Sequence, residues 1–267
     1  MSFTFVVEQT LNGLQFGLMR FLLAAGLTLV LGIMDMINLA HGSLYMIGAY
    51  LTAALTQATG SFAAALPLAR VATAVIGMAL EISLLRALYR RDHLSQVLAT
   101  FALILIANEV VRIVFGSQPL MLALPPALSG SIELMPGLSD PVYRLTIIGV
   151  GLVVAAALYL LVMRTRLGML VRAGATNREM ALVMGVRVGP LFTALFGLGA
   201  ALCALAGAML GPLLAVQVGM GESILILSFV VVIIGGIGSI RGALVGAILV
   251  GTRRRTARTW ASAHLLR

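Results

Sequence analysis

Long apolar runs alternate with short polar or glycine-rich segments along the whole chain. A membrane-spanning helix needs roughly 20 mostly apolar residues. Runs near this length predict spans close to residues 11–33, 42–58, 63–85, 95–115, 143–163, 189–210 and 223–236. A further apolar stretch at 242–251 has ten residues, too few to cross a bilayer. The pattern therefore predicts an all-α, polytopic membrane protein with an incomplete last span.

Composition supports this class. Hydrophobic residues make up 61% of the 267 residues and charged residues only 10%, whereas a soluble domain carries about 25% charge. No long polar block interrupts the chain, so we expect one membrane domain over residues 1–251. Residues 252–267 form an Arg-rich tail, which is either a genuine cytoplasmic end or a truncated or frame-shifted one. The first ten residues carry Glu8 and no basic residue, so no cleavable signal is expected.

The basic residues indicate the orientation. The net charge is +9, and every basic side chain other than histidine is arginine. Arginines gather in the loops 86–94 and 164–188, whereas 116–142 and 211–222 carry only acidic charges. The positive-inside rule places the first two loops in the cytoplasm and the other two outside. This arrangement argues against nucleic-acid binding. It puts the N-terminus outside and the break at 34–42 near the cytoplasmic end of its helices, unless the second segment is re-entrant.

The first break, residues 34–43, is the most informative segment. It brings Asp35, Asn38, His41 and Ser43 close to apolar sequence, and polar groups at membrane depth usually face a bundle interior or a cavity. A helix that restarts at His41 or Gly42 would present unpaired N–H groups suited to a carboxylate. Two interpretations stay open: an interfacial loop with an N-cap, or part of a substrate path or gate. For His41 we expect a structural hydrogen-bonding role rather than proton transfer.

A second glycine-rich break follows the run 223–234, and it is either a helix interruption deep in the bundle or a tight turn. Arg241 favours the turn, because a charge prefers the interface. Steps of the small-xxx-small type at Gly207 to Gly211 and Gly242 to Gly246 predict close helix packing. Glu109 and Arg112, three residues apart in the fourth span, are expected to neutralise each other.

The basic loop 164–188 contains a predicted short helix. Thr176 can cap its N-terminus with Glu179 in a capping box, and Gly185 is a plausible stop. Met180, Val183 and Met184 would then share one side. A helix this short is marginal alone in water, so it needs a surface on which to dock; a solvated loop is the alternative.

No catalytic set is present. The sequence has no P-loop, no Gly-x-Ser-x-Gly and no His/Cys metal spacing. The single cysteine, Cys203, lies in an apolar run and is expected to be a small core residue. We therefore expect no catalytic residue, no metal and no cofactor, and no enzyme activity in this chain itself.

Three motifs resemble those of one family. The segment 37–50, which contains Asn38-Leu39-Ala40-His41-Gly42, is similar to the Asn-Phe-Ala-His-Gly signature of branched-chain amino acid ABC transporter permeases. Residues 172–186 resemble the cytoplasmic coupling segment of that family, and residues 229–243 resemble its late glycine-rich motif. The resemblance runs from about residue 11 to residue 251. Departures from the family pattern are Arg20, Leu39, Arg241 and the missing last span.

The resemblance implies about eight helices per subunit and two permease subunits around one pathway, usually as a heterodimer. Two ATPase subunits would lie on the cytoplasmic face of a bacterial inner membrane. A periplasmic or extracellular binding protein would deliver leucine, isoleucine, valine or another hydrophobic amino acid. The residues assigned to the pathway are Asn38, His41, Gly42, Ser43, Gly235, Gly236, Gly238 and Ser239. Those assigned to ATPase coupling are Arg172, Thr176, Glu179, Met180 and Gly185.

Two other transport classes stay open. A secondary transporter driven by an ion gradient needs a membrane-embedded acid that titrates, and Asp35 or Glu109 would be the candidate. A passive channel needs neither such an acid nor a partner ATPase.

Overall fold

In a computed structural model, the backbone is described for residues 3–135, 138–176 and 178–265, and side chains for 6–133, 139–174, 176 and 180–252. Nearly all regular structure is helical. The helices are α1 (Phe3–Met34), α2 (His41–Thr59), α3 (Phe62–Leu80), η1 (Glu81–Leu85), α4 (Arg86–Leu88), α5 (His93–Phe115), η2 (Pro126–Leu128), α6 (Val142–Arg164), α7 (Arg166–Thr176), α8 (Arg178–Val183), α9 (Val188–Leu210), α10 (Met220–Gly235) and α11 (Ile240–Leu265).

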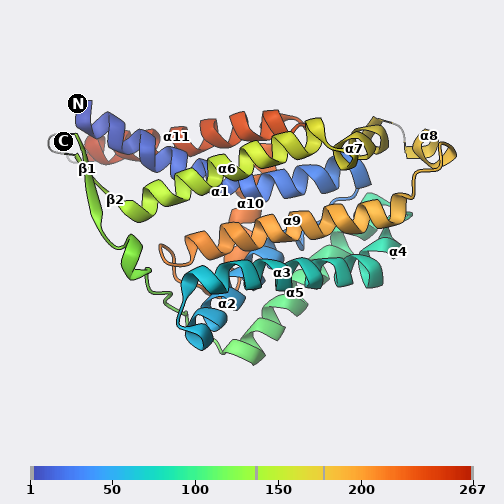
Figure 1. Cartoon of the computed structure of the whole chain (residues 1–267), viewed down its shortest axis with the longest axis horizontal. Coiled ribbons are helices and arrows are strands. Elements are labelled where there is room, and N and C mark those ends of the chain that lie inside the picture. Colours follow the sequence, from blue (N-terminus) through green and yellow to red (C-terminus); the bar gives the residue numbers. More distant parts are fainter. Residues whose placement is uncertain (1–2, 136–137, 177, 266–267) are drawn as a thin grey trace.

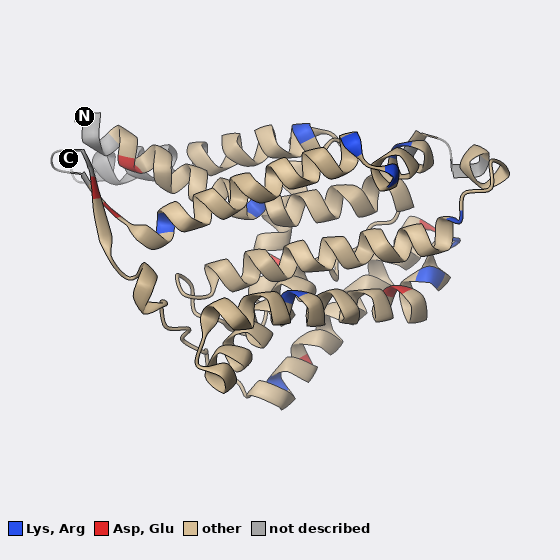
Figure 2. Ribbon diagram, viewed as in Figure 1, with Lys and Arg blue, Asp and Glu red and all other residues tan. Residues whose placement is uncertain are grey.

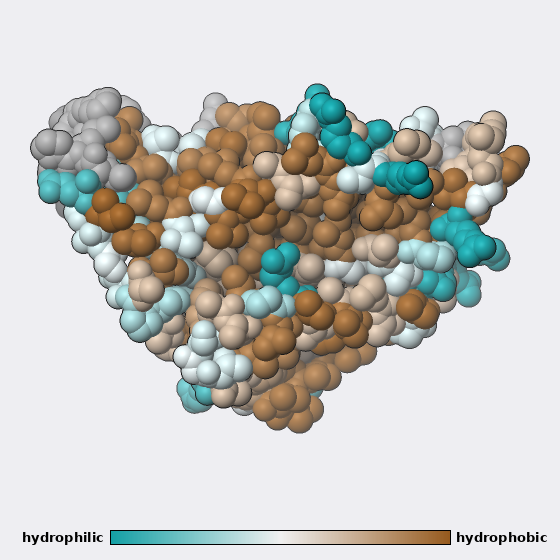
Figure 3. All heavy atoms as spheres, viewed as in Figure 1, coloured by the Kyte–Doolittle hydropathy of each residue, from teal (hydrophilic) through white to brown (hydrophobic). Residues whose placement is uncertain are grey.

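The expected all-α class is confirmed. Five helices in the described chain are long and apolar enough to cross a membrane, and α10 and the first part of α11 are shorter apolar helices. Each overlaps a predicted span or apolar stretch. Hydrophobic residues cover most of the face seen in Figure 3, as expected for a surface that lipid solvates.

Two long helices form the middle of the bundle. α1 packs against α6, α9, α10 and α11, and α9 also packs against α2 and α3 (Figure 1). The largest fully buried side chains are aromatic residues of these and neighbouring helices: Phe21, Tyr45, Tyr50, Tyr143, Phe192 and Phe196.

The loops separate to two ends of the molecule as the charge pattern predicted. The Arg-rich end holds α4, α7 and α8, and Figure 2 shows basic residues gathered there. The opposite end, here called the hairpin end, holds an antiparallel pair of short strands, β1 (Ser131–Met135) and β2 (Leu138–Pro141). There the two predicted external loops contact each other, since the backbones of Leu120 and Val216 exchange hydrogen bonds of 2.8 and 3.0 Å.

The Arg-rich tail does not interrupt its helix. α11 continues from Ile240 to Leu265 without a stop at Arg253, because arginine is a good helix former. α11 runs antiparallel to α1: a Cβ on Gly17 would meet the backbone of Ala247, and one on Gly13 would lie 2.9 Å from Thr252 Cα. The helix therefore leaves at the hairpin end, which is opposite α7 and α8. The assignment of residues 252–267 to a cytoplasmic or an aberrant tail stays a prediction.

Candidate functional site: two helix breaks and a coupling segment

The first break returns the chain into the bundle. α1 ends at Met34 near the Arg-rich end, where the Tyr89 hydroxyl lies 3.8 Å from Met34 Sδ. α2 begins at His41, whose ring lies against Gly26 and Gly199. Gly199 is at the middle of α9, so α2 starts about halfway across the bundle. The expectation that the break stays near the cytoplasmic end is wrong for residues 38–43, because residues 35–40 carry the chain from the end of α1 back to the middle of the bundle before α2 begins.

Side-chain hydrogen bonds hold this return. The Asn38 carboxamide oxygen accepts from the Ala40 N–H at 3.0 Å, and Gln96 Oε1 of α5 accepts from the Ile37 N–H at 3.3 Å. Gln96 Nε2 also donates to the carbonyls of Leu88 and Arg91. Since irregular backbone inside a membrane must be satisfied by protein, Gln96 is a supporting residue that the sequence analysis missed.

His41 is fully buried at the first residue of α2, with its ring 6.3 Å from that of Phe196. Neither ring nitrogen has a hydrogen-bond partner among the described residues, and the same holds for Ser43 Oγ and Asn38 Nδ2. The expected hydrogen-bonding role of His41 is therefore wrong for this state of the molecule. The burial of Asn38 and His41 also excludes the simple interfacial loop.

The N-terminal ends of α2 and α10 meet at this depth. A Cβ on Gly42 would lie 2.6 Å from the Gly221 carbonyl oxygen, and one on Gly221 would lie 2.1 Å from that of Gly42. Only glycine allows such an approach. The predicted close packing is confirmed further along α2, where Gly207 of α9 lies against the Tyr45 carbonyl.

The second break is a tight turn near the Arg-rich end. Ser239 Oγ accepts from the Gly242 N–H at 3.0 Å and so caps α11, while Gly236 and Gly238 have positive φ. Gly238 lies against Gly32, two residues before the end of α1. The turn interpretation therefore describes this segment, and the interruption deep in the bundle does not.

A cavity of about 290 Å³ lies between this turn and α7, which holds the start of the predicted coupling segment. Its lining includes Gly238, Ser239 and Arg241 from the turn, Tyr159 of α6 and Arg172 of α7. Arg241 Nη2 donates to the Tyr159 hydroxyl at 2.9 Å. Arg172 donates to the Val162 carbonyl, one of the unpaired acceptors at the end of α6. Arg172 thus fixes α7 to α6 on one wall of the cavity.

The predicted coupling segment forms two helices rather than one. Thr176 is the last residue of α7, and its hydroxyl donates to the Arg172 carbonyl at 2.9 Å. The Glu179 side chain of the expected capping box lies outside the described residues. Gly185 has φ 83° and stops α8 as predicted, with the Val186 N–H bonded to the Ala181 carbonyl. α8 projects at the Arg-rich end (Figure 1). The predicted apolar residues are exposed there: Met180 and Val183 of α8, and Met184 directly after it.

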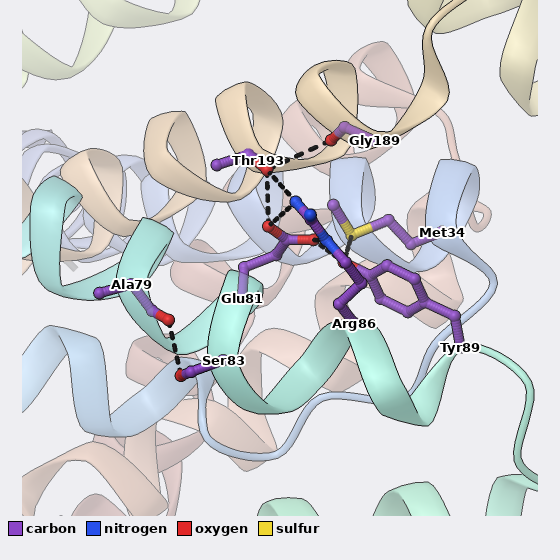
Figure 4. A network of polar contacts seen from close by, with 8 residues as sticks. All are labelled: Met34, Ala79, Glu81, Ser83, Arg86, Tyr89, Gly189 and Thr193. Carbon is purple, nitrogen blue, oxygen red and sulfur yellow. Dashed lines mark hydrogen bonds and ion pairs between the residues drawn. The ribbon is translucent and has the colours of Figure 1, made fainter.

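The buried carboxylate of Glu81 connects the N-terminal part of α9 with Tyr89, which contacts the end of α1. Glu81 is fully buried and forms an ion pair of 3.1 Å with Arg86. Its oxygens also accept from the Tyr89 hydroxyl at 2.7 Å and the Thr193 hydroxyl at 2.6 Å (Figure 4). Glu81 opens a five-residue π-helix, a feature that often marks functional sites. An acid at the end of an apolar run with an arginine five residues later was the overlooked signal.

Comparison with known proteins settles the family. A family model described as "Branched-chain amino acid transport system / permease component" matches residues 9–265. The chain belongs to this family.

Individual relatives agree with the family assignment. The permease is 31% identical to the high-affinity branched-chain amino acid transport system permease protein BraD of Pseudomonas aeruginosa, over 92% of this chain and 84% of the relative. It is 29% identical to the corresponding LivH protein of Escherichia coli, over 94% and 85%. A probable LivH of Methanocaldococcus jannaschii is 30% identical over 86% and 74%. No solved structure matches. The chain is a multi-pass membrane permease component of a transport system.

The two acids considered for ion coupling lie in different surroundings. Glu109 pairs with Arg112 at 3.1 Å, as expected, with both side chains about half exposed. Asp35 is exposed just after α1, with φ 49°. Glu222, assigned from sequence to an external loop, instead lies in the first turn of α10 and accepts a 2.7 Å hydrogen bond from Asn108 of α5. Within the described part of the chain, no group of three His, Cys, Asp or Glu could hold a metal ion.

Proposed function

We propose that this permease imports branched-chain amino acids through an ABC transporter of the bacterial inner membrane. It works with a second permease subunit, two ATPase subunits and a substrate-binding protein. The names of the relatives support the substrate class, since each is a branched-chain amino acid permease. Enzyme activity is assigned to the partner ATPases and not to this chain.

The observation that carries the drive mechanism is the shape of the coupling segment. Met180 and Val183 of α8 and the following Met184 are exposed at the Arg-rich end, and six helical residues with an exposed apolar side need a partner surface to stay folded. An ATPase bound there would push on α7 and α9. The residues assigned to this contact and its support are Arg172, Thr176, Glu179, Met180 and Gly185.

The pathway assignment rests on the first break. Asn38, His41, Gly42 and Ser43 lie where α2 and α10 meet in the bundle, and the free N–H groups of a helix start suit the carboxylate of an amino acid. Gly235, Gly236, Gly238 and Ser239 form the turn at the cytoplasmic mouth, beside the cavity that Arg172 lines. Motion of the coupling segment would open or close this mouth.

The test separates ATP hydrolysis from uptake. Replacing Glu179 and Met180 by alanine in the complete transporter should leave the permease in the membrane, leave hydrolysis running and abolish leucine uptake. Met121→Ala is the control, because Met121 is also an exposed methionine but lies before the hairpin. Unchanged uptake in the double variant contradicts the coupling role. Uptake by the permease alone that requires a proton or sodium gradient would favour a secondary transporter.

A further inference from the structure

Four polar side chains form a patch on the apolar helices α5 and α10: the half-buried Asn108 and the exposed Glu109, Arg112 and Glu222. The side chains of Glu109 and Arg112 are 57% and 52% exposed, and Glu222 is also exposed. Asn108 joins the two helices through its 2.7 Å hydrogen bond to Glu222. This polar patch is separate from the breaks assigned above, and none of its residues belongs to the pathway set.

Two measures place Glu222 at depth. Asn108 lies seven residues before the end of α5, or roughly 10 Å along the helix from its outer end. Glu222 also follows Gly221, which contacts Gly42. Gly42 is next to His41, whose ring lies against Gly199 at the middle of α9. The hydrocarbon layer is about 30 Å thick, so Glu222 is well inside it by both measures.

A carboxylate at this depth needs water, a counter-charge or protein around it. Glu109 has Arg112 as its counter-charge, whereas none of the ion pairs among the described residues includes Glu222. The neutral amide of Asn108 and the start of α10 offset part of the cost of this charge. Lipid is therefore an unfavourable neighbour for the Glu222 carboxylate, and a water-filled space that admits a cation is a favourable one.

We propose that Glu222, held by Asn108, binds the ammonium group of the transported amino acid inside the pathway. This rests on the proposed function, because it assigns the α5–α10 face to the transport route. A hydrophobic amino acid carries one cation, one anion and an apolar side chain. Glu222 supplies the partner for the cation, and Leu105 and Ile226, both exposed on the same two helices, supply apolar wall.

The first experiment measures uptake of labelled leucine by the complete transporter in proteoliposomes. Glu222→Gln should reduce the uptake rate by about tenfold or more, the value of a charge-assisted hydrogen bond, whereas Glu222→Asp should retain most of the rate. Glu109→Gln is the matched control: it removes an acid from the same patch whose charge Arg112 already uses, and we expect less than about fivefold change. Equal uptake by Glu222→Gln and wild type overturns the proposal, as does a Glu222→Asp variant no better than Glu222→Gln.

A second measurement does not depend on transport. Asn108→Cys should react with water-soluble methanethiosulfonates, faster with a cationic than an anionic reagent, and that preference should shrink when Glu222→Gln is added. Leucine should slow the reaction. The native Cys203 is fully buried and serves as the unreactive reference. Absence of labelling in every nucleotide state, or oxidative cross-linking of Asn108→Cys to the second permease, overturns the proposal. Either result leaves wild-type leucine uptake, and hence the proposed function, intact. Absence of leucine uptake by the wild-type transporter would instead contradict the proposed function, on which this proposal rests.

Discussion

The approach of α2 to α9 at Gly48 gives a sharp test of the bundle. A Cβ at position 48 would lie 2.3 Å from Ala204 Cα and 2.6 Å from Ala204 Cβ. Carbon atoms pack at roughly 3.5–4.0 Å, so Gly48→Ala must move the two helices apart by about 1 Å. A backbone atom cannot rotate away, which puts the cost near the upper end of the roughly 1–3 kcal/mol typical of overpacking.

Helix propensity opposes this cost. Alanine is favoured over glycine in a helix by about 1 kcal/mol, so the net loss for Gly48→Ala is about 2 kcal/mol. For a chain of this size each kcal/mol lowers the melting temperature by about 2–4 °C. We therefore expect a decrease of about 4–8 °C in thermal unfolding of the detergent-purified permease.

Two further variants make the measurement specific. Gly149→Ala in α6 is the control, because a Cβ there meets nothing within 4 Å; it should be neutral or slightly stabilising. Adding Ala204→Gly to Gly48→Ala removes the clash with the methyl group of residue 204 but not the clash with its backbone, so the double variant should recover only part of the loss. A Gly48→Ala protein as stable as Gly149→Ala would refute the close approach of α2 and α9.

Three other changes test the polar supports. Glu81→Ala should lower the melting temperature more than Glu81→Gln, because the amide keeps an acceptor for the hydroxyls of Tyr89 and Thr193; equal effects in thermal unfolding would contradict this. Gln96→Ala should speed amide hydrogen exchange in residues 35–40 without affecting β1, since it removes the acceptor for the Ile37 N–H. Asp92 caps α5 through the Ser95 hydroxyl and N–H, and these hydrogen bonds lower the pKa of its carboxyl. A lowered pKa stabilises the fold above the unfolded-state value near 4, and this stabilisation is lost as pH falls through the folded value. The melting-temperature difference between wild type and Asp92→Ala should therefore shrink on acidification from pH 6 to pH 3, and a constant difference would contradict it.

Spans and loop sides were predictable because they depend on local properties. An apolar run of a given length forms a helix wherever it crosses lipid, and Arg86 or Arg164 marks a loop whatever that loop contacts. The stop at Gly185 was predictable for the same reason, since the left-handed conformation that ends α8 favours glycine.

The depth at which a helix break lies in the bundle was not predictable in the same way. Nothing in the spacing of residues 34–43 states whether the chain stays at the surface after Met34 or turns back. That choice is fixed by partners distant in sequence: Gly221, which leaves room for Gly42, and Gln96, which accepts from Ile37. The same applies to the second break: Ser239 caps α11 locally, but the position of the neighbouring Gly238 against Gly32 depends on how α1 and α11 pack.

The placement of Glu222 shows that the positive-inside rule gives no information about the position of an acidic residue. Orientation is read from arginine and lysine, and acidic residues contribute little to it. An acid at the edge of an apolar run is therefore assigned to a loop by default, as Glu222 was, or passed over, as Glu81 was. Both acids have hydrogen-bond partners on other helices, Asn108 of α5 for one and Thr193 of α9 for the other. In a membrane protein such an acid is expensive unless protein or water surrounds it, so each one at the end of an apolar run is better treated as a candidate contact between helices or with substrate.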